Sequence, residues 1–329
     1  MKIRAIGVLL ITCLTLGSAV VTAAEVSTVL EGLNNPCGIA VQPGTKHVFV
    51  SDSAAGRVVR VVDGKAQDVI VGFPQDIYGK GPMYNIGPLG LVFLDKNTLV
   101  VGGGGRPDGE EKIRVYKVPA AGQDAIKADN MEAGFELPPT DETKGEGNFY
   151  ALAATSNAVY ATCNGDDTKG WVAKLTITSD GSYGGYERFI ATKEATEVDA
   201  PVGITMNPQG QIAVGQMGEI TIPHDSLLTF YDTNGKMLLN LETELFDITA
   251  LAYSPANGQL YATDYAWMDT GEGGLFQLIA DGEQGLSVKK VESLDKPTAM
   301  AFGEDGVLYV TVFGSGDGNS GKLLKVSGL

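Results

Sequence analysis

The chain has 329 residues, of which 40 are Asp or Glu and 24 are Lys or Arg, giving a net charge of −16. This excess of acidic residues disfavours nucleic acid and anionic membranes as partners, whereas cations, basic proteins and neutral ligands remain compatible with it. The 43% content of hydrophobic residues indicates a packed core instead of a disordered chain.

The N-terminal residues predict a secretory signal peptide. Lys2 and Arg4 precede an uncharged run from Ala5 to Val21, which is followed by the small residues Ala23 and Ala24. An uncleaved membrane anchor is the alternative, but the run is shorter than the roughly 20 apolar residues that a span needs. We therefore expect residues 1–24 to be removed. The mature chain, residues 25–329, is then secreted or periplasmic and has no integral membrane span.

The rest of the chain repeats six times. Each unit opens with a short apolar strand, at 34–41, 86–93, 147–154, 199–206, 246–253 and 295–302. A short turn rich in Gly, Asn, Asp or Pro leads to a second apolar run, and a third and a weaker fourth run follow. The spacings between equivalent opening positions are 52, 61, 52, 47 and 49 residues. Four short strands per unit, repeated six times, predict a six-bladed β-propeller.

The two ends of the chain predict how the ring closes. The last unit supplies only three strands before Leu329, and the segment Val26–Leu30 stands where a fourth strand would precede the first unit. We expect this segment to pair beside Lys322–Val326, which removes an open sheet edge. A solenoid is the rival repeat architecture, but it has no reason to divide one unit between its two ends. The predicted fold is therefore all-β, a single propeller domain over residues 25–329.

Three sequence features resemble a known family. The P-x-G-I pattern of the openers, VFVSDSAAGRVVRVV at 48–62 and QLYATDY at 259–265 resemble NHL repeats and the wider SMP-30/gluconolactonase-like group of six-bladed propellers. The resemblance implies the fold and leaves the activity open, because the group contains both enzymes and interaction modules.

The resemblance also implies where a metal would lie. Gluconolactonase-like enzymes hold a metal at the channel mouth through a Glu before the first blade and through Asn and Asp from later blades. Here Asn35-Pro36-Cys37-Gly38 stands where an acidic Glu-Gly-Pro is expected, so the activity does not transfer intact. Asn148 and Asp247 are the positions that match its oxygen ligands.

A second pattern leads to these two residues and adds Asn35. Asn35, Asn148 and Asp247 stand at equivalent positions of blades one, three and five, so sixfold geometry predicts three oxygen ligands about 120° apart. Calcium is the candidate cofactor, because it accepts oxygen ligands in variable geometry and often keeps water. The alternatives are a solvated rim or an ordinary ion pair between Asp247 and Lys296.

The long loops fall on one face of the predicted propeller, which is where binding on a rigid scaffold usually occurs. They follow the second strand of several units and connect the first blades, and they concentrate acidic residues. Aromatic rings among them could stack on a sugar or anchor a protein. The candidate ligand-binding residues of this face are Tyr78, Tyr84, Tyr265, Trp267, His224, Asp225 and Asp264.

No complete catalytic motif is present. The chain has two histidines, no G-x-S-x-G elbow and no Walker lysine, so a serine hydrolase or a phosphate-binding loop is not indicated. Our main interpretation is a non-catalytic, monomeric propeller that binds a protein, peptide or glycan on its acidic loop face. The alternative is a metal-dependent, calcium-type hydrolase or lactonase, and quinone-dependent oxidation stays open behind it.

Overall fold

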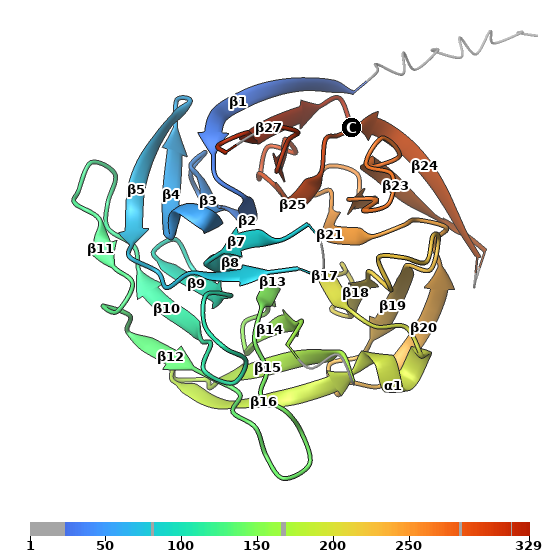
Figure 1. Cartoon of the computed structure of the whole chain (residues 1–329), viewed down its shortest axis with the longest axis horizontal. Coiled ribbons are helices and arrows are strands. Elements are labelled where there is room, and N and C mark those ends of the chain that lie inside the picture. The colour runs from blue at the N-terminus through green and yellow to red at the C-terminus, as the bar shows by residue number, and fades with distance from the viewer. Residues whose placement is uncertain (1–23, 80–81, 166–168, 283–284, 317) are drawn as a thin grey trace, which may run out of the picture.

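The computed structural model describes residues 24–79, 82–165, 169–282, 285–316 and 318–329. Six β-sheets surround one axis, so the predicted all-β, six-bladed propeller is confirmed (Figure 1). The predicted signal peptide lies outside the described residues except for Ala24. In the part of the chain that the structure describes, no helix has the length and apolar character needed to cross a membrane.

The first three blades are numbered from the N-terminus, each from its innermost strand outward. Blade 1 contains β2 (Pro36–Val41), β3 (Val48–Asp52), β4 (Arg57–Val62) and β5 (Lys65–Val71). Blade 2 contains β8 (Pro88–Phe93), β9 (Thr98–Gly103), β10 (Ile113–Lys117) and β12 (Ala133–Phe135). Blade 3 contains β13 (Phe149–Ala154), β14 (Ala158–Cys163), β15 (Trp171–Ile177) and β16 (Tyr183–Ala191).

The last three blades continue around the ring. Blade 4 contains β17 (Pro201–Met206), β18 (Ile212–Gln216), β19 (Leu227–Tyr231) and β20 (Met237–Glu242). Blade 5 contains β21 (Ile248–Tyr253), β22 (Leu260–Asp264), β23 (Gly274–Asp281) and β24 (Gly285–Ser293). Blade 6 contains β25 (Pro297–Phe302), β26 (Leu308–Val312), β27 (Gly321–Ser327) and β1 (Glu25–Leu33).

A few short elements lie outside this pattern. β6 (Asp76–Tyr78) and β7 (Tyr84–Ile86) form a hairpin, and β11 (Ile126–Lys127) adds a parallel strand to the outer edge of blade 1. Two single turns of helix complete the set, η1 (Ser53–Ala55) and α1 (Thr192–Thr196).

The hydrophobic core lies between neighbouring blades. The apolar side chains of each four-stranded sheet cannot be buried within one blade, so they pack on the next blade and form one buried cluster at each of six interfaces. At the junction of blades 6 and 1, Val50 and Val59 share such a cluster with Leu323. The stability of each blade therefore depends on its neighbours.

The two ends of the chain meet in blade 6, as the sequence predicts. β1 pairs antiparallel with β27, and the register joins Val26 to Val326 and Glu31 to Lys322. The Lys322 ammonium lies 3.0 Å from the Glu31 carboxylate, while Leu33 at the end of β1 is 1% exposed. The pairing gives β27 a partner on its outer edge and brings Leu33 into the core between blades 6 and 1.

A β-bulge interrupts each innermost strand near the channel. The register shifts once in each of β2, β8, β13, β17, β21 and β25, always at the start of the strand. Bulges bend a strand and redirect side chains. The bulged segments carry the six side chains that line the narrow part of the channel, Cys37, Leu89, Tyr150, Val202, Thr249 and Thr298.

Truncation of Leu33 tests the closure of the ring. Leu33→Ala should lower the free energy of unfolding by about 2–5 kcal/mol, the usual cost of deleting a fully buried leucine side chain. Thr28→Ala, at an exposed position of the same strand, should change it by less than about 0.5 kcal/mol. Urea unfolding of both variants is the measurement, and equal stabilities would contradict a structural role for β1.

Candidate functional site

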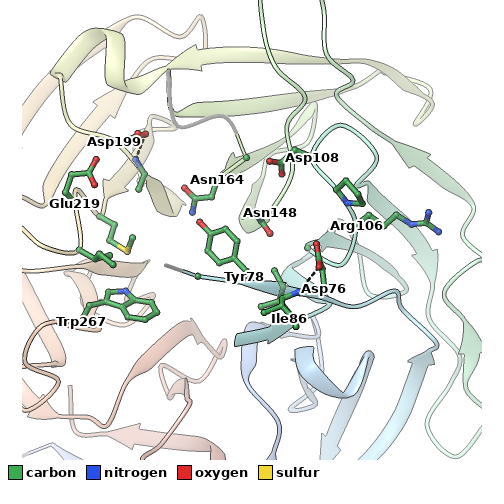
Figure 2. A pocket seen from close by; sticks show the side chains of 18 of the residues that line it. Asp76, Tyr78, Ile86, Arg106, Asp108, Asn148, Asn164, Asp199, Glu219 and Trp267 are labelled. Carbon is green, nitrogen blue, oxygen red and sulfur yellow. Dashed lines mark hydrogen bonds between the residues drawn. The ribbon is translucent and has the colours of Figure 1, made fainter. Parts of the chain in front are cut away.

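A large cavity lies on the loop face at the mouth of the channel. Its volume is about 550 Å³, and its walls come from the loop between β9 and β10, the loop between β14 and β15, the loop between β18 and β19, and the connections between blades. Figure 2 shows that its polar side chains surround the ring of Tyr78. The cavity therefore occupies the face on which the sequence places the long loops.

The hairpin of β6 and β7 reaches across the channel mouth. β7 extends from the junction of blades 1 and 2 toward the centre of the ring (Figure 1). Tyr78 and Tyr84 face each other in its register, and Tyr78 is 43% exposed. A large exposed aromatic ring at the entrance provides an apolar surface on which a ligand can stack.

One wall of the cavity gathers a carboxylate and two amides from three separate loops. Asp108, Asn148 and Asn164 all line it, and the backbone N–H of Asn164 donates to the carbonyl of Gly147. A β-carbon at Gly147 would lie 2.6 Å from Asp108 Oδ1, and one at Gly165 would lie 2.8 Å from the same atom. Only glycine fits such approaches, so the Asp108 carboxylate packs directly beside the backbone next to both asparagines.

The backbone conformation explains why asparagine occupies position 148. Its φ is 47°, in the left-handed region that asparagine tolerates better than most residues. Asn35, Ala200 and Lys296, at the equivalent position of other blades, have φ values of 48°, 55° and 58°. This turn directs the chain into the innermost strand, so asparagine at 35 and 148 also has a purely conformational reason.

The buried side chain of Glu111 supports the same wall through hydrogen bonds to its backbone. It is 1% exposed, and its carboxylate accepts hydrogen bonds from the backbone N–H groups of Arg106 and Asn148. Burial raises the pKa of Glu111 to about 7, although these two N–H groups and Arg114 act in the opposite direction. Glu111 therefore ties two loops of the cavity together through a carboxyl group that is costly to ionise.

The cavity is acidic. Among the described residues, its lining includes the carboxylates of Asp76, Asp108, Asp199 and Glu219 and one cationic side chain, Arg106. The Asp199 carboxylate lies 2.7 Å from the Lys193 ammonium, which offsets part of this charge. Such a lining disfavours strongly anionic ligands.

Aromatic side chains form the base of the cavity and narrow the channel. The Tyr84 and Tyr265 hydroxyl oxygens are 2.8 Å apart. The rings of Tyr265 and Trp267 stack with their centroids 4.4 Å apart. These three side chains also line a narrower cavity of about 90 Å³. The Trp267 indole Nε1 is buried and has no acceptor among the described residues, so a ligand oxygen that reached it would form a new hydrogen bond.

Of the three predicted metal ligands, only Asn148 lines either cavity. The Asn35 side chain donates to the carbonyl of Asn85 over 3.1 Å, and the Asp247 carboxylate accepts the backbone N–H of Trp267 at 2.6 Å. Among the described residues, no three His, Cys, Asp or Glu side chains converge as a metal site would require. The predicted calcium site stays a prediction whose three residues do not share a cavity.

The predicted ligand-binding residues fall into two groups. Tyr78, Tyr84, Tyr265 and Trp267 line the two cavities, whereas His224, Asp225 and Asp264 line neither. His224 is exposed, and its Nδ1 lies 2.7 Å from the carbonyl of Glu244.

The carboxylates of Asp225 and Asp264, in the second group, accept hydrogen bonds from backbone N–H groups. The Asp225 carboxylate accepts the N–H of Glu219 at 2.9 Å. The buried carboxylate of Asp264 accepts the N–H groups of Phe246, Asp247 and Ala266. Both carboxylates therefore stabilise loops.

Sequence reasoning missed the residues that complete the polar wall. Asn164 and Arg106 are not among the residues predicted from the sequence. Asp108 and Glu111 belong to the acidic residues of the long loops, to which the sequence assigns no individual role. A signal existed in the glycines, since Gly147 and Gly165 mark the places where the backbone approaches the two carboxylates.

Neither the comparison with protein-family models nor that with curated proteins gave a match. Solved structures do match. The PQQ-bound aldose sugar dehydrogenase of Streptomyces coelicolor is 14% identical with a TM-score of 0.63, covering 92% of this chain and 98% of that one. The apo-form of the soluble aldose sugar dehydrogenase of Escherichia coli is 13% identical with a TM-score of 0.58, covering 93% and 100%.

A gluconolactonase from Xanthomonas campestris is 14% identical with a TM-score of 0.57, covering 92% of this chain and 89% of that one. The chain has an SMP-30/gluconolactonase-like propeller fold. The similar structures carry the names of sugar-processing enzymes, which corrects our expectation of a non-catalytic propeller and favours the enzymatic alternative. Identities this low show the fold, so the activity itself is a matter for proposal.

The raised pKa of Glu111 predicts a pH dependence of stability. Between its ordinary pKa of 4.5 and the folded value of about 7, the folded protein holds a proton that the unfolded chain releases. The contribution of Glu111 to stability is therefore fully present below pH 4.5 and is lost as pH rises toward 7 and above. Thermal unfolding between pH 5 and 8 should show a smaller decrease in melting temperature for Glu111→Gln than for the wild type.

The exposed neighbour provides the matched control. Glu110→Gln should keep the slope of the wild type, because its side chain reaches solvent. An unchanged slope in Glu111→Gln would show that this carboxyl group does not titrate between these pH values.

Proposed function

We propose that this chain hydrolyses a neutral lactone in the cavity on its loop face. The observation that carries the proposal is the wall on which the Asp108 carboxylate stands beside the amides of Asn148 and Asn164, above an aromatic base. A base, hydrogen-bond donors for a developing oxyanion and a stacking surface are the groups that ester hydrolysis needs. The names of the structurally similar gluconolactonases support the same reaction class.

The charge of the cavity fits the change that this reaction makes. A lactone is neutral, so the carboxylates of Asp76, Asp108 and Glu219 do not repel it. Hydrolysis produces a hydroxy acid that ionises at neutral pH. The same carboxylates then repel the product, which favours its release.

The residues of the wall can perform the reaction in two steps. Asp108 takes a proton from a water molecule as the water oxygen bonds to the lactone carbonyl carbon, and the carbonyl oxygen becomes an oxyanion. The side-chain N–H groups of Asn148 and Asn164 donate hydrogen bonds to this oxyanion. The bond between the carbonyl carbon and the ring oxygen then breaks, and the ring oxygen takes the proton back from Asp108.

A quinone cofactor does not fit this lining. The similar Streptomyces structure contains PQQ, which carries three carboxyl groups, whereas Arg106 is the single cation among the described residues of the cavity wall. Three ionised carboxyl groups would face four protein carboxylates. We therefore favour hydrolysis over quinone-dependent oxidation.

Calcium dependence remains a proposal beside this mechanism, and no step above requires the ion. Asp108 is one carboxylate with two amides near it, which is a small share of the six to eight oxygens that calcium takes. Export to a periplasm or beyond, and a monomeric state, also stay proposals, supported by residues 1–24 and by the acidic surface charge.

Asp108→Asn tests the proposed base. The amide keeps the shape of the side chain but does not accept the proton, so kcat for lactone hydrolysis should fall about 10²- to 10⁴-fold. Asp269→Asn, in a loop of the same face but outside the cavity wall, should keep the activity of the wild type. Acid release from D-gluconolactone measures both variants, and an equally active Asp108→Asn would contradict the mechanism.

Removal of divalent cations tests the calcium prediction separately. If calcium binds the folded chain, a chelator should lower the melting temperature and added calcium should restore it, because a ligand of the native state stabilises that state. Elemental analysis of purified protein would accompany the melting curves. Absence of metal together with unchanged melting temperatures would remove calcium from the account and leave the role of Asp108 intact.

A further inference from the structure

The narrow cavity beneath the polar wall has a different chemistry from the wall itself. It is lined by the apolar side chains of Leu89, Val202 and Phe313, by the Cys37 thiol and by aromatic rings. Burial raises the pKa of Cys37 to about 12, so the thiol is neutral. None of its described lining residues is Asp, Glu, Lys, Arg or His. A charged or strongly hydrated group would lose its solvation there.

Three hydroxyl groups deep in this narrow cavity already have partners on the scaffold. The Tyr150 hydroxyl donates to the carbonyl of Thr298 over 2.9 Å, and the Thr298 hydroxyl donates to the carbonyl of Pro36 over 2.6 Å. The Thr249 hydroxyl donates to the carbonyl of Pro297 over 2.9 Å. The remaining side-chain donors, on Asn148, Asn164 and Trp267, belong to residues that also line the outer cavity. Away from them, the narrow cavity offers a ligand mainly dispersion and hydrophobic contact.

The narrow cavity adjoins the site of the proposed reaction. Six residues line both spaces: Tyr78, Ile86, Asn148, Asn164, Met217 and Trp267. The two asparagines that face the reacting carbonyl group therefore stand at the junction of a polar compartment and an apolar one. A substrate whose reacting group contacts this wall can extend a substituent downward between Tyr78 and Trp267.

The volume limits what that substituent can be. The cavity measures about 90 Å³. An apolar protein cavity of about 150 Å³ holds a benzene molecule with its six carbon atoms, so this one has room for about three or four carbon atoms. An aromatic ring is too large, and a methyl group would leave most of the space unfilled.

From this geometry we propose that the substrate is a lactone with a short saturated alkyl substituent of about three or four carbon atoms, which enters the narrow cavity while the ring carbonyl faces Asp108. The position of the ring at the wall rests on the proposed function, whereas the occupancy of the narrow cavity by an alkyl group rests on the volume and lining of that cavity. The alkyl group orients the ring as well as adding affinity.

A series of lactones tests this proposal on the full chain. The probes are γ-butyrolactones that carry hydrogen, methyl, ethyl, propyl, butyl or hexyl on the carbon next to the ring oxygen. For the wild type, kcat/KM should rise about fourfold per added carbon up to propyl or butyl and should fall for hexyl. Calorimetric dissociation constants for the Asp108→Asn variant should follow the same order, because that variant retains the narrow cavity.

Two variants of the cavity shift the preferred chain length in opposite directions. Val202→Leu adds one carbon to the lining and should shorten the optimum by about one carbon, while Leu89→Ala enlarges the space and should move the optimum to longer chains. Val92→Leu is the matched control, because Val92 lines a cavity at the other end of the channel and should leave the optimum unchanged.

The outcomes separate this inference from the proposed function. A chain-length optimum that shifts with Val202→Leu or Leu89→Ala supports the inference. A flat response to chain length, or an optimum that neither variant moves, would overturn it even if lactones are hydrolysed. If no lactone is hydrolysed but the binding series still has its optimum, the proposed function fails and the alkyl site stands.

Discussion

The bulge at the start of each innermost strand is the feature on which the channel and the site depend. It frees backbone carbonyl groups from the sheet, and hydroxyl groups of neighbouring blades bond to them. Ser51 donates to the carbonyl of Leu89 over 2.6 Å, and Thr162 donates to that of Val202 over 2.9 Å. Tyr150 reaches from blade 3 to Thr298 on blade 6. These bonds hold the innermost strands together and narrow the channel beneath the loop face.

The repeats predicted the fold because each unit carries its own strand and turn pattern. The last unit has only three strands of its own, and the additional strand at the N-terminus supplies its fourth. The direction of side chains near the channel was harder to predict. Sequence reasoning compared Asn35 and Asp247 around the ring, whereas the bulge turns Cys37 and Thr249 into the channel. An extra residue in a strand reverses which side chains point to each face of the sheet, and no local sequence pattern indicates this bulge.

The site was predicted in part for a similar reason. Trp267 follows β22 closely, and Tyr78 lies in the connection between blades 1 and 2, so their place on the loop face could be deduced from the repeat. The polar wall depends on how three loops pack together, and glycines 147 and 165 set that packing through close contact with Asp108. Long-range contact of this kind leaves only a weak trace in a single sequence.

The central claim is that the cavity on the loop face hydrolyses a neutral lactone without redox chemistry. Parallel assays of the wild type would test it most directly, one following acid release from D-gluconolactone at constant pH, the other following dye reduction by glucose with added PQQ and calcium. The account predicts enzyme-dependent acid release and no dye reduction. Dye reduction without acid release would contradict it, since the acidic lining would then accommodate a cofactor with three carboxyl groups.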